Sequence, residues 1–247
     1  MGSSYAKKAV DICLGEVGYQ CECSKWNKYA DELDKVDFFT GCGKKQCLDF
    51  CAVGLCWTIY KAIIDPSAES DPEAAKWSSH FFMYQSDICD MAAVVKYLYG
   101  YFADNNAVTD NPERGDFVIF QKSNGVMYHC GMVTDWNWDN DAIFVTEFNT
   151  EGGKVLTHIY SFSDIGKKIK CFCRPRYDGW EIPSGSAPVA SDDENKEDYT
   201  EIIDRLAHEV LEGKYGNYPR RKQLINGLGY GNIYGYVQKR VNELLYR

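Results

Sequence analysis

Apolar residues in the first part of the chain recur at helical intervals. The spacing predicts one helix over residues 5–20 and a second, short helix over 24–34 that begins at Ser24. The segment 35–48 contains glycines but shows neither helical nor strand periodicity, so it is expected to be irregular. The N-terminal part of the chain is therefore predicted to be mainly helical.

A third, strongly apolar helix is predicted over residues 49–64. Asp49 is a suitable N-cap, because a carboxylate can accept hydrogen bonds from the unpaired N–H groups of a first helical turn. Pro66 should end this helix, since proline disfavours helical backbone in the residue before it. One or two further helices are expected between residues 71 and 100, the second of them over 87–100.

The pattern changes to strands after Pro112. Short runs of β-branched and aromatic residues are separated there by turn sequences that contain glycine. The expected strands cover residues 115–121, 128–136, 142–148, 154–162 and 167–177. Helices followed by consecutive strands predict an α+β domain whose strands form an antiparallel meander.

A compositional break divides the chain near its C-terminus. Residues 181–196 are rich in Pro, Ser and Ala and then acidic, which is typical of a flexible linker. Three helices are expected after it, over 197–212, 219–227 and 234–246. We therefore predict a main domain at residues 1–180, a linker at 181–196 and a small three-helix bundle at 197–247.

Charge and composition narrow the classes of function. The chain of 247 residues has a formal net charge of −9, which argues against nucleic acid as a partner. It shows no signal peptide and no apolar stretch long enough to span a membrane, so we expect cytoplasmic synthesis and no membrane partner. Its 11 cysteines are interpreted mostly as buried thiols formed in a reducing compartment. These features are compatible with a monomer.

One cysteine lies where a thiol can act as a nucleophile. Cys51 falls in the first turn of the helix predicted over 49–64, where the positive end of the helix dipole favours a thiolate. The N–H groups of the same turn could also stabilise an oxyanion. Cys47 precedes the helix and Cys56 lies a turn inside it, so both are weaker candidates.

A thiol nucleophile also needs a base and a group that orients the base. Among the 4 histidines, His129 is the best candidate, because Gly131 beside it permits close approach of another segment. His158 is expected on the solvated face of its strand. If the strand over 142–148 pairs with that of His129, Glu147 or Asn149 could bind the imidazole. A solvated strand position remains the alternative for Glu147.

Four motifs carry a resemblance to a known family. The chain has D-F-C at 49–51, P-E-R-G-D at 112–116, H-C-G-M-V at 129–133 and E-F-N-T at 147–150. In order and spacing these are similar to the D-W-C, P-x-x-G-D, H-x-G-[IV]-V and E-G-N-T motifs of CHAP amidases and peptidases, relatives of papain-like and NlpC-type hydrolases. The resemblance implies a papain-like CHAP domain over about residues 5–178.

The same resemblance assigns roles to four residues. It implies Cys51 as nucleophile and His129 as base. Glu147 would orient the base, and Asn149 would be a supporting polar group. All four are therefore candidate catalytic residues.

The chain departs from the family pattern at several points. Phe148 replaces a small glycine and is expected to reshape the cleft wall. Gln46 could help an oxyanion site, as a glutamine does in papain-like enzymes, or be a loop-surface residue. Some CHAP members bind calcium through an acidic loop before the cysteine. That spacing is missing here, so no metal and no cofactor are expected.

The C-terminal module resembles a second family. It contains L-A-x-x-V-L-x-G-K and V-Q-x-x-V-N-E-L, as does the Cpl-seven (CW-seven) wall-binding repeat of phage lysozymes. The resemblance implies a three-helix bundle that binds the sugar–peptide unit of peptidoglycan. Lys214, Tyr215 and Arg221 are the candidate contacts, with Tyr215 offering a flat face and Arg221 pairing with a carboxylate. A module of other specificity remains the alternative.

Together, the two resemblances imply a phage endolysin-like peptidoglycan hydrolase. It would cut an amide bond of the bacterial cell wall, either as an N-acetylmuramoyl-L-alanine amidase or as an endopeptidase. Its partner would be peptidoglycan outside the membrane, so another factor must release the enzyme from the cytoplasm. Two alternatives stay open: a non-catalytic wall-binding protein, and another papain-like cysteine hydrolase.

Overall fold

The computed structural model describes residues 4–64, 71–85, 91–177 and 200–215, together with 221, 224, 225, 228, 237, 240, 241 and 244. The chain divides into two compact units, Met1–Ser184 and Gly185–Arg247. The segment 181–196, predicted to be a linker, lies outside the described residues.

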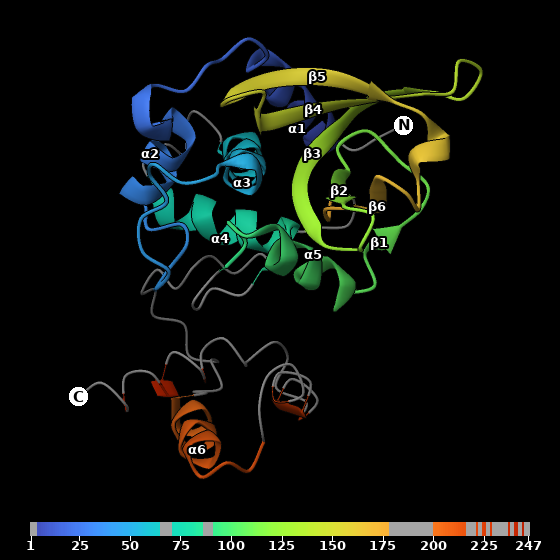
Figure 1. Cartoon of the computed structure of the whole chain (residues 1–247). Coiled ribbons are helices and arrows are strands. Elements are labelled where there is room, and N and C mark those ends of the chain that lie inside the picture. Colours follow the sequence, from blue (N-terminus) through green and yellow to red (C-terminus); the bar gives the residue numbers. More distant parts are fainter. Residues whose placement is uncertain are drawn as a thin grey trace. The chain divides into compact units, whose positions relative to one another are not determined.

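The first unit begins with helices that pack around one buried helix (Figure 1). They are α1 (Ser4–Gly15), α2 (Lys28–Lys35), α3 (Cys51–Ile63), α4 (Pro72–Phe82) and α5 (Val95–Ala103). Almost every side chain of α3 is buried, and α1, α2 and α4 all contact it. This central position explains why the sequence of α3 is apolar on all sides instead of amphipathic.

The second helix begins later than predicted. Asn27 caps α2 by accepting a hydrogen bond from the N–H of Ala30 at 2.9 Å, so the helix starts at Lys28. Ser24, the predicted start, lies instead in the short 3-10 turn η1 (Cys23–Lys25) with a φ of 59°. Both Ser and Asn are good capping residues, and pattern alone did not separate them.

The prediction that Asp49 caps the apolar helix is wrong. Phe50 occupies the N-cap position of α3 and provides no side-chain hydrogen bond. The Asp49 carboxylate binds Nζ of Lys25 at 2.5 Å and accepts a hydrogen bond from Nδ2 of Asn149 at 3.0 Å. The first turn of α3, which Cys51 opens, is therefore left without a cap from the Phe50 side chain.

The region between residues 71 and 100 holds α4 and the start of α5. Asp71 caps α4 by accepting a hydrogen bond from the N–H of Ala74 at 3.0 Å. α5 begins at Val95, later than the predicted 87–100 helix; residues 86–90 and Pro66 lie outside the described part of the chain. No helix among the described residues is both long and apolar enough to cross a membrane.

The strands form one six-stranded antiparallel sheet in the order β1-β6-β2-β3-β4-β5. They are β1 (Val108–Thr109), β2 (Phe117–Gln121), β3 (Met127–Asn137), β4 (Ala142–Thr150), β5 (Lys154–Tyr160) and β6 (Ile169–Cys173). The prediction of an α+β domain is confirmed. The meander covers β2 to β5 only, because β6 returns to pair with the free edge of β2. β1, with two residues, is too short to show an alternating pattern.

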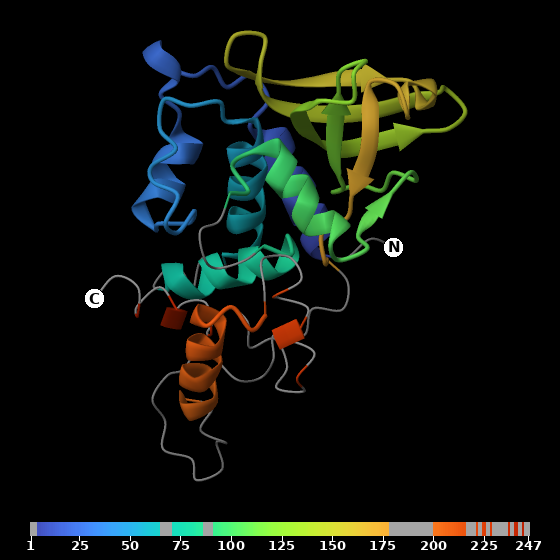
Figure 2. The ribbon, with the colours of Figure 1, turned by 60° about the horizontal axis from the view of Figure 1, so that its bottom comes forward.

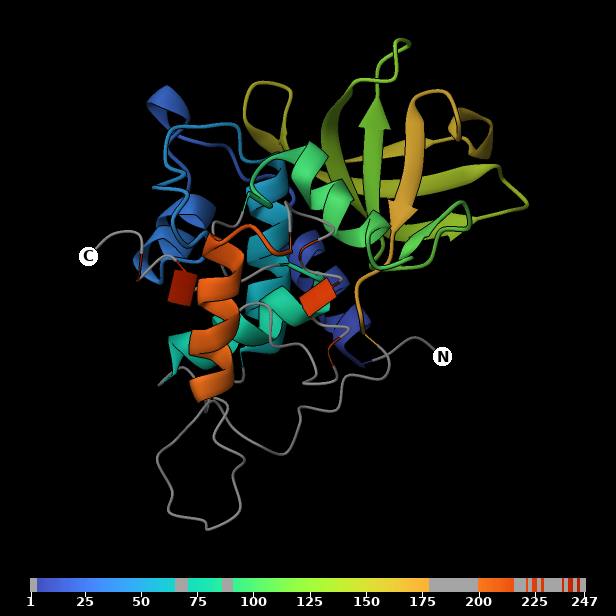
Figure 3. The ribbon, with the colours of Figure 1, turned by 90° about the horizontal axis from the view of Figure 1, so that it is seen from below.

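The sheet is buried on both faces. One face packs against the helices, which lie together on one side of the sheet in Figures 2 and 3. On the other face the sheet curves around a small second core. That core contains Val118, Phe120, Val133, Ile143, Val145, Ile169 and Phe172. Consecutive residues of one strand therefore reach two different environments.

The second unit contains α6 (Thr200–Leu211) and a small core of its own. Leu206 and Val210 of α6 pack with Ile225, Val237 and Val241. α6 agrees with the helix predicted over 197–212. Most of the other two predicted helices lies outside the described residues, so the three-helix bundle stays a prediction.

Candidate functional site

Cys51 opens helix α3 and lines an open cleft. Its side chain is only 6% exposed, so most of the sulfur's surroundings are protein. The N–H of Ala52, in the first turn of α3, lowers the pKa of the Cys51 thiol. A thiolate is favoured at such a helix start, where N–H groups and the helix dipole face the sulfur.

His129 on β3 brings an imidazole to this sulfur. Both residues line the same cleft, and Nε2 of His129 lies 2.8 Å from Oε2 of Glu147. Because Nε2 is engaged by Glu147, Nδ1 is the nitrogen left for the thiol. The ring also stacks on Phe120, with 5.7 Å between ring centroids. The imidazole is thus fixed by both a hydrogen bond and a ring contact.

The protonation of the pair follows from these contacts. The neighbouring Cys130 and His129 lower the pKa of the Cys51 thiol to about 5, against the opposing effect of burial. Burial alone would lower the pKa of His129, but its hydrogen bonds to Cys51 and Glu147 outweigh burial and raise it to about 9. Near neutral pH the pair is therefore a thiolate beside an imidazolium.

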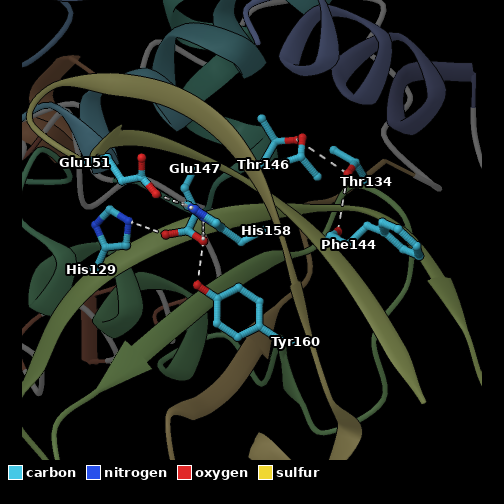
Figure 4. Close-up of polar contacts among 9 residues, drawn as sticks. His129, Thr134, Phe144, Thr146, Glu147, Glu151, His158 and Tyr160 are labelled. Atoms are coloured by element: carbon cyan, nitrogen blue, oxygen red, sulfur yellow. Dashed lines mark hydrogen bonds and ion pairs between the residues drawn. The ribbon is translucent and has the colours of Figure 1, made fainter. Parts of the chain in front are cut away.

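Glu147 on β4 holds the imidazole and is itself held on its other oxygen. Oε1 accepts a hydrogen bond from the hydroxyl of Tyr160 at 2.6 Å and lies 3.0 Å from Nδ1 of His158 (Figure 4). The carboxylate is only 3% exposed. These hydrogen bonds, that from His129 first, outweigh burial and keep the pKa of Glu147 below its usual value. A solvated strand position, the alternative for Glu147, is wrong.

Two residues of this network were not predicted. His158, expected on a solvated strand face, instead contacts Glu147, and its Nε2 lies 3.4 Å from Oε1 of Glu151. Tyr160 lies two residues further along β5, so both side chains face the same side of the sheet. The alternation of strand residues predicts that His158 and Tyr160 share a face. It does not predict the register between β4 and β5, which brings both side chains to Glu147.

Asn149 lines the same cleft but does not contact the imidazole. Its Nδ2 donates to Oδ1 of Asp49 at 3.0 Å, and its backbone has a φ of 57°. This contact ties the end of β4 to the loop before Cys51. Asn149 therefore positions the loop of the nucleophile, while Glu147 alone binds His129 at Nε2.

An open cleft of about 610 Å³ gives access to these groups. Its volume lies in the range of small-ligand sites. It is lined by Asp49, Cys51, Tyr128, His129, Glu147, Asn149, Thr150, Glu151, His158, Ile159 and Tyr160. The candidate nucleophile, base and orienting carboxylate thus meet in one place that a substrate can reach.

The structure corrects the expectation that Phe148 shapes the cleft, and for Gln46 it supports the loop alternative. Phe148 does not form its wall: the ring is fully buried against α3, where a Cβ on Gly54 would lie 2.2 Å from Cγ of Phe148. Gln46 braces a loop, because Nε2 donates to the carbonyl of Asn27 at 2.7 Å and Oε1 accepts from the N–H of Cys47 at 3.2 Å. Neither residue lines the cleft.

Two other residues of the CHAP-like motifs, Asp116 and Gly131, make contacts that hold the sheet together. Asp116, in the P-E-R-G-D motif, is buried and binds Arg174 through two hydrogen bonds of 3.0 and 2.9 Å. This pair joins the start of β2 to the residue after β6. Gly131 allows close strand contact, since a Cβ there would lie 2.6 Å from Cγ1 of Val145 and 2.9 Å from Cγ of Glu147.

In the C-terminal unit, the candidate wall contacts differ in exposure. Tyr215 is 8% exposed and packs in the core of this unit, with its hydroxyl 2.5 Å from Oε2 of Glu209. The expected flat aromatic face is therefore mostly covered. Lys214 is exposed and binds Oε1 of Glu209 at 2.7 Å, and Arg221 is half-buried. Lys214 and Arg221 are the more accessible candidates.

Within the described residues, no group of three or more His, Cys, Asp or Glu side chains is arranged to hold a metal ion.

Comparison with known proteins gives one match. No curated protein and no solved structure matches the chain. Residues 204–245 match the family model described as the CW_7 repeat. This match lies within the C-terminal unit and does not include Cys51 or His129. The C-terminal module is thus similar to the CW_7 repeat, which supports a role in cell-wall binding.

Proposed function

We propose that this chain is a peptidoglycan hydrolase that cuts an amide bond of the bacterial cell wall with Cys51 as nucleophile. The observation that carries the proposal is that Cys51, His129 and Glu147 line one open cleft, with His129 bound to Glu147 at 2.8 Å. The wall-binding repeat on the same chain supports peptidoglycan as the substrate. The four motifs similar to those of CHAP domains support the same reaction class.

The proposed reaction begins with attack of the Cys51 thiolate on an amide carbonyl carbon. The C–N bond then breaks, and the imidazolium of His129 gives its proton to the departing amine nitrogen. A water molecule loses a proton to the neutral imidazole and attacks the thioester. The carboxylic acid product leaves, and the thiolate–imidazolium pair is restored.

Glu147 and the first turn of α3 support these steps. Glu147 keeps the imidazole oriented and stabilises its charge, as the third group of a catalytic triad does. Phe50 supplies no side-chain cap, so the N–H groups at the start of α3 are the candidate donors to the oxyanion. The bond cut is either the muramoyl–L-alanine amide or a peptide bond.

A turbidity assay on bacterial wall suspensions tests the proposal. The wild-type protein should clear the suspension, and Cys51→Ala should slow clearing by about a thousandfold or more, as expected for loss of a covalent nucleophile. Cys47→Ala is the matched control, because Cys47 is exposed, near Cys51 in sequence and absent from the cleft lining. Equal clearing by wild type and Cys51→Ala would refute the proposal.

A further inference from the structure

The carboxylate of Glu147 has separate partners on its two oxygens. Oε2 lies 2.8 Å from Nε2 of His129, and an ionised carboxylate only accepts hydrogen bonds, so the imidazole is the donor. Oε1 accepts the hydroxyl of Tyr160 at 2.6 Å and lies 3.0 Å from Nδ1 of His158 (Figure 4). The position of Oε2, which meets the imidazole, therefore depends on the groups that hold Oε1.

The hydroxyl of Tyr160 is the better fixed of the two groups at Oε1. Its distance of 2.6 Å is typical of an O–H that donates to an ionised acceptor. Burial and the neighbouring Glu147 raise the pKa of Tyr160, so the hydroxyl keeps its proton and stays a donor. The side chain of His158 is 32% exposed, and its Nε2 also lies 3.4 Å from Oε1 of Glu151. The imidazole of His158 is thus shared between two carboxylates, whereas the one hydroxyl proton of Tyr160 goes to Glu147.

Ring contacts fix Tyr160 in turn. Its ring packs against Phe120 with 5.0 Å between ring centroids, and Phe120 also stacks on His129 at 5.7 Å. With the hydrogen bonds of Glu147, these contacts form a closed circuit to which each of the strands β2 to β5 contributes one side chain. The orientation of the imidazole therefore depends on all four strands, and Tyr160 supplies the link from β5.

We propose that Tyr160 is a positioning residue whose hydroxyl fixes the Glu147 carboxylate and so orients the imidazole of His129 for its work on Cys51. The inference rests on the proposed hydrolase function, because it concerns the base of that reaction. A glutamate side chain has several rotatable bonds, and its last torsion is broad. A donor at Oε1 removes this freedom before substrate binds, which keeps the base in its productive geometry.

The direct test is the solvent exchange of the Nε2 proton of His129, followed by NMR on protein that contains isotope-labelled histidine. His129→Gln identifies the signal by its loss. Tyr160→Phe removes the hydroxyl and keeps the ring that packs against Phe120. Exchange should become about tenfold faster or more in this variant, the change expected when a hydrogen bond to a charged group is lost. Unchanged exchange would overturn the inference.

Tyr29→Phe is the matched control. The hydroxyl of Tyr29 also donates to a glutamate, at 2.8 Å to Oε2 of Glu16, and neither residue lines the cleft. This variant should leave the exchange of the His129 proton unchanged, and equal acceleration in both variants would also overturn the inference. If Tyr160→Phe does not fold, judged by near-ultraviolet circular dichroism, Tyr160→Leu serves in its place, because it also lacks the hydroxyl.

A cycle of variants tests whether Tyr160 acts through Glu147 or on the substrate itself, since both residues line the cleft. On wall suspensions, Tyr160→Phe should lower the maximal clearing rate by about tenfold or more. The wall concentration at half-maximal rate should change by less than about twofold. In a Glu147→Ala background, Tyr160→Phe should lower the rate by less than about twofold, because the carboxylate that Tyr160 positions is absent. A full tenfold loss in that background would overturn the inference and assign Tyr160 to the substrate.

Proton exchange needs no wall substrate, so the two proposals fail separately. A wild-type protein that does not clear walls, while Tyr160→Phe shows the faster exchange, would refute only the proposed hydrolase. Clearing by wild type together with unchanged exchange in Tyr160→Phe would refute only the role of Tyr160.

Discussion

The charge on the imidazole of His129 depends on two acidic neighbours, Cys51 and Glu147. Cys51 and Glu147 both line the cleft, and Oε2 of Glu147 lies 2.8 Å from Nε2 of the ring. Both carry negative charge near neutral pH, and both therefore favour the imidazolium. The rate of amide cleavage should follow the population of this ion pair.

The pH profile of kcat/KM should therefore be bell-shaped. Activity should fall below pH about 5, where the Cys51 thiolate takes up a proton, since its pKa is lowered to about 5. It should fall again above pH about 9, where His129 loses the proton that the leaving amine needs. The measurement is the clearing rate at limiting wall concentration over a pH series.

Glu147→Gln should move the alkaline limb of that profile to lower pH. Removing an opposite charge beside an imidazolium lowers its pKa, by about one unit or more. Glu73→Gln, at an exposed residue of α4, is the control and should leave the limb in place. An alkaline limb that stays in place in Glu147→Gln would show that Glu147 does not set the charge of His129.

At this scale the sequence predicted the three residues in direct contact but not their surroundings. These three residues could be predicted because each lies at a position with a local sequence signature. Cys51 lies at a helix start, His129 lies on a strand close to a glycine, and Glu147 lies on the next strand. The contacts of His158 and Tyr160 depend on the register between β4 and β5. Local periodicity carries no information on register between strands.

At the scale of elements, the distance between α3 and the sheet is set by one glycine. Gly54 has no side chain, and the ring of Phe148 occupies the space that a Cβ would need. A larger residue at 54 would push α3 away from β4. Because Cys51 is three residues earlier on the same helix, this packing also fixes where the sulfur lies.

Gly54→Ala should accordingly destabilise the protein by about 2 kcal/mol or more, the cost of overpacking a core. Gly100→Ala in α5 is a matched control, since nothing lies within 4 Å of the added Cβ. Alanine there should be neutral or stabilising by up to about 1 kcal/mol through helix propensity. The measurement is urea unfolding, and equal midpoints for the two variants would contradict this packing.

The types of most elements were predictable, and their boundaries were less so. Helices repeat every 3.6 residues and strands every 2, and both patterns can be recognised within a short stretch of sequence. Helix α3 and strands β2 to β5 could therefore be predicted. The start of α2 was missed because Ser24 and Asn27 are both capping residues, and only the fold selects Asn27. The pairing of β6 with β2 is a long-range contact that local pattern does not contain.

At the scale of the whole molecule, the chain combines a candidate catalytic unit with a module similar to the CW_7 repeat. The two compact units meet in sequence between Ser184 and Gly185. Linking a binding module to a catalytic one raises the local concentration of substrate without new contacts at the cleft. The repeat should therefore govern attachment to the wall, and the cleft should govern cleavage.

A chain that ends at Ser184 should lose attachment and keep its thiol chemistry. Its co-sedimentation with purified walls should weaken by about tenfold or more. Alkylation of Cys51 should keep its wild-type pH midpoint, which also reports that the shortened unit is folded. Full-length Cys51→Ala is the control and should sediment like the wild type. Unchanged sedimentation of the shortened chain would contradict the assignment of wall binding to the repeat.

The most direct measurement of the central claim is mass spectrometry of the soluble fragments released from purified peptidoglycan. The wild-type protein should release fragments that each carry a new amine end and a new carboxylic acid end, and these ends identify the amide that is cut. Cys51→Ala should release none of them. Failure of the wild type to release such fragments, or their release by Cys51→Ala, would contradict the account.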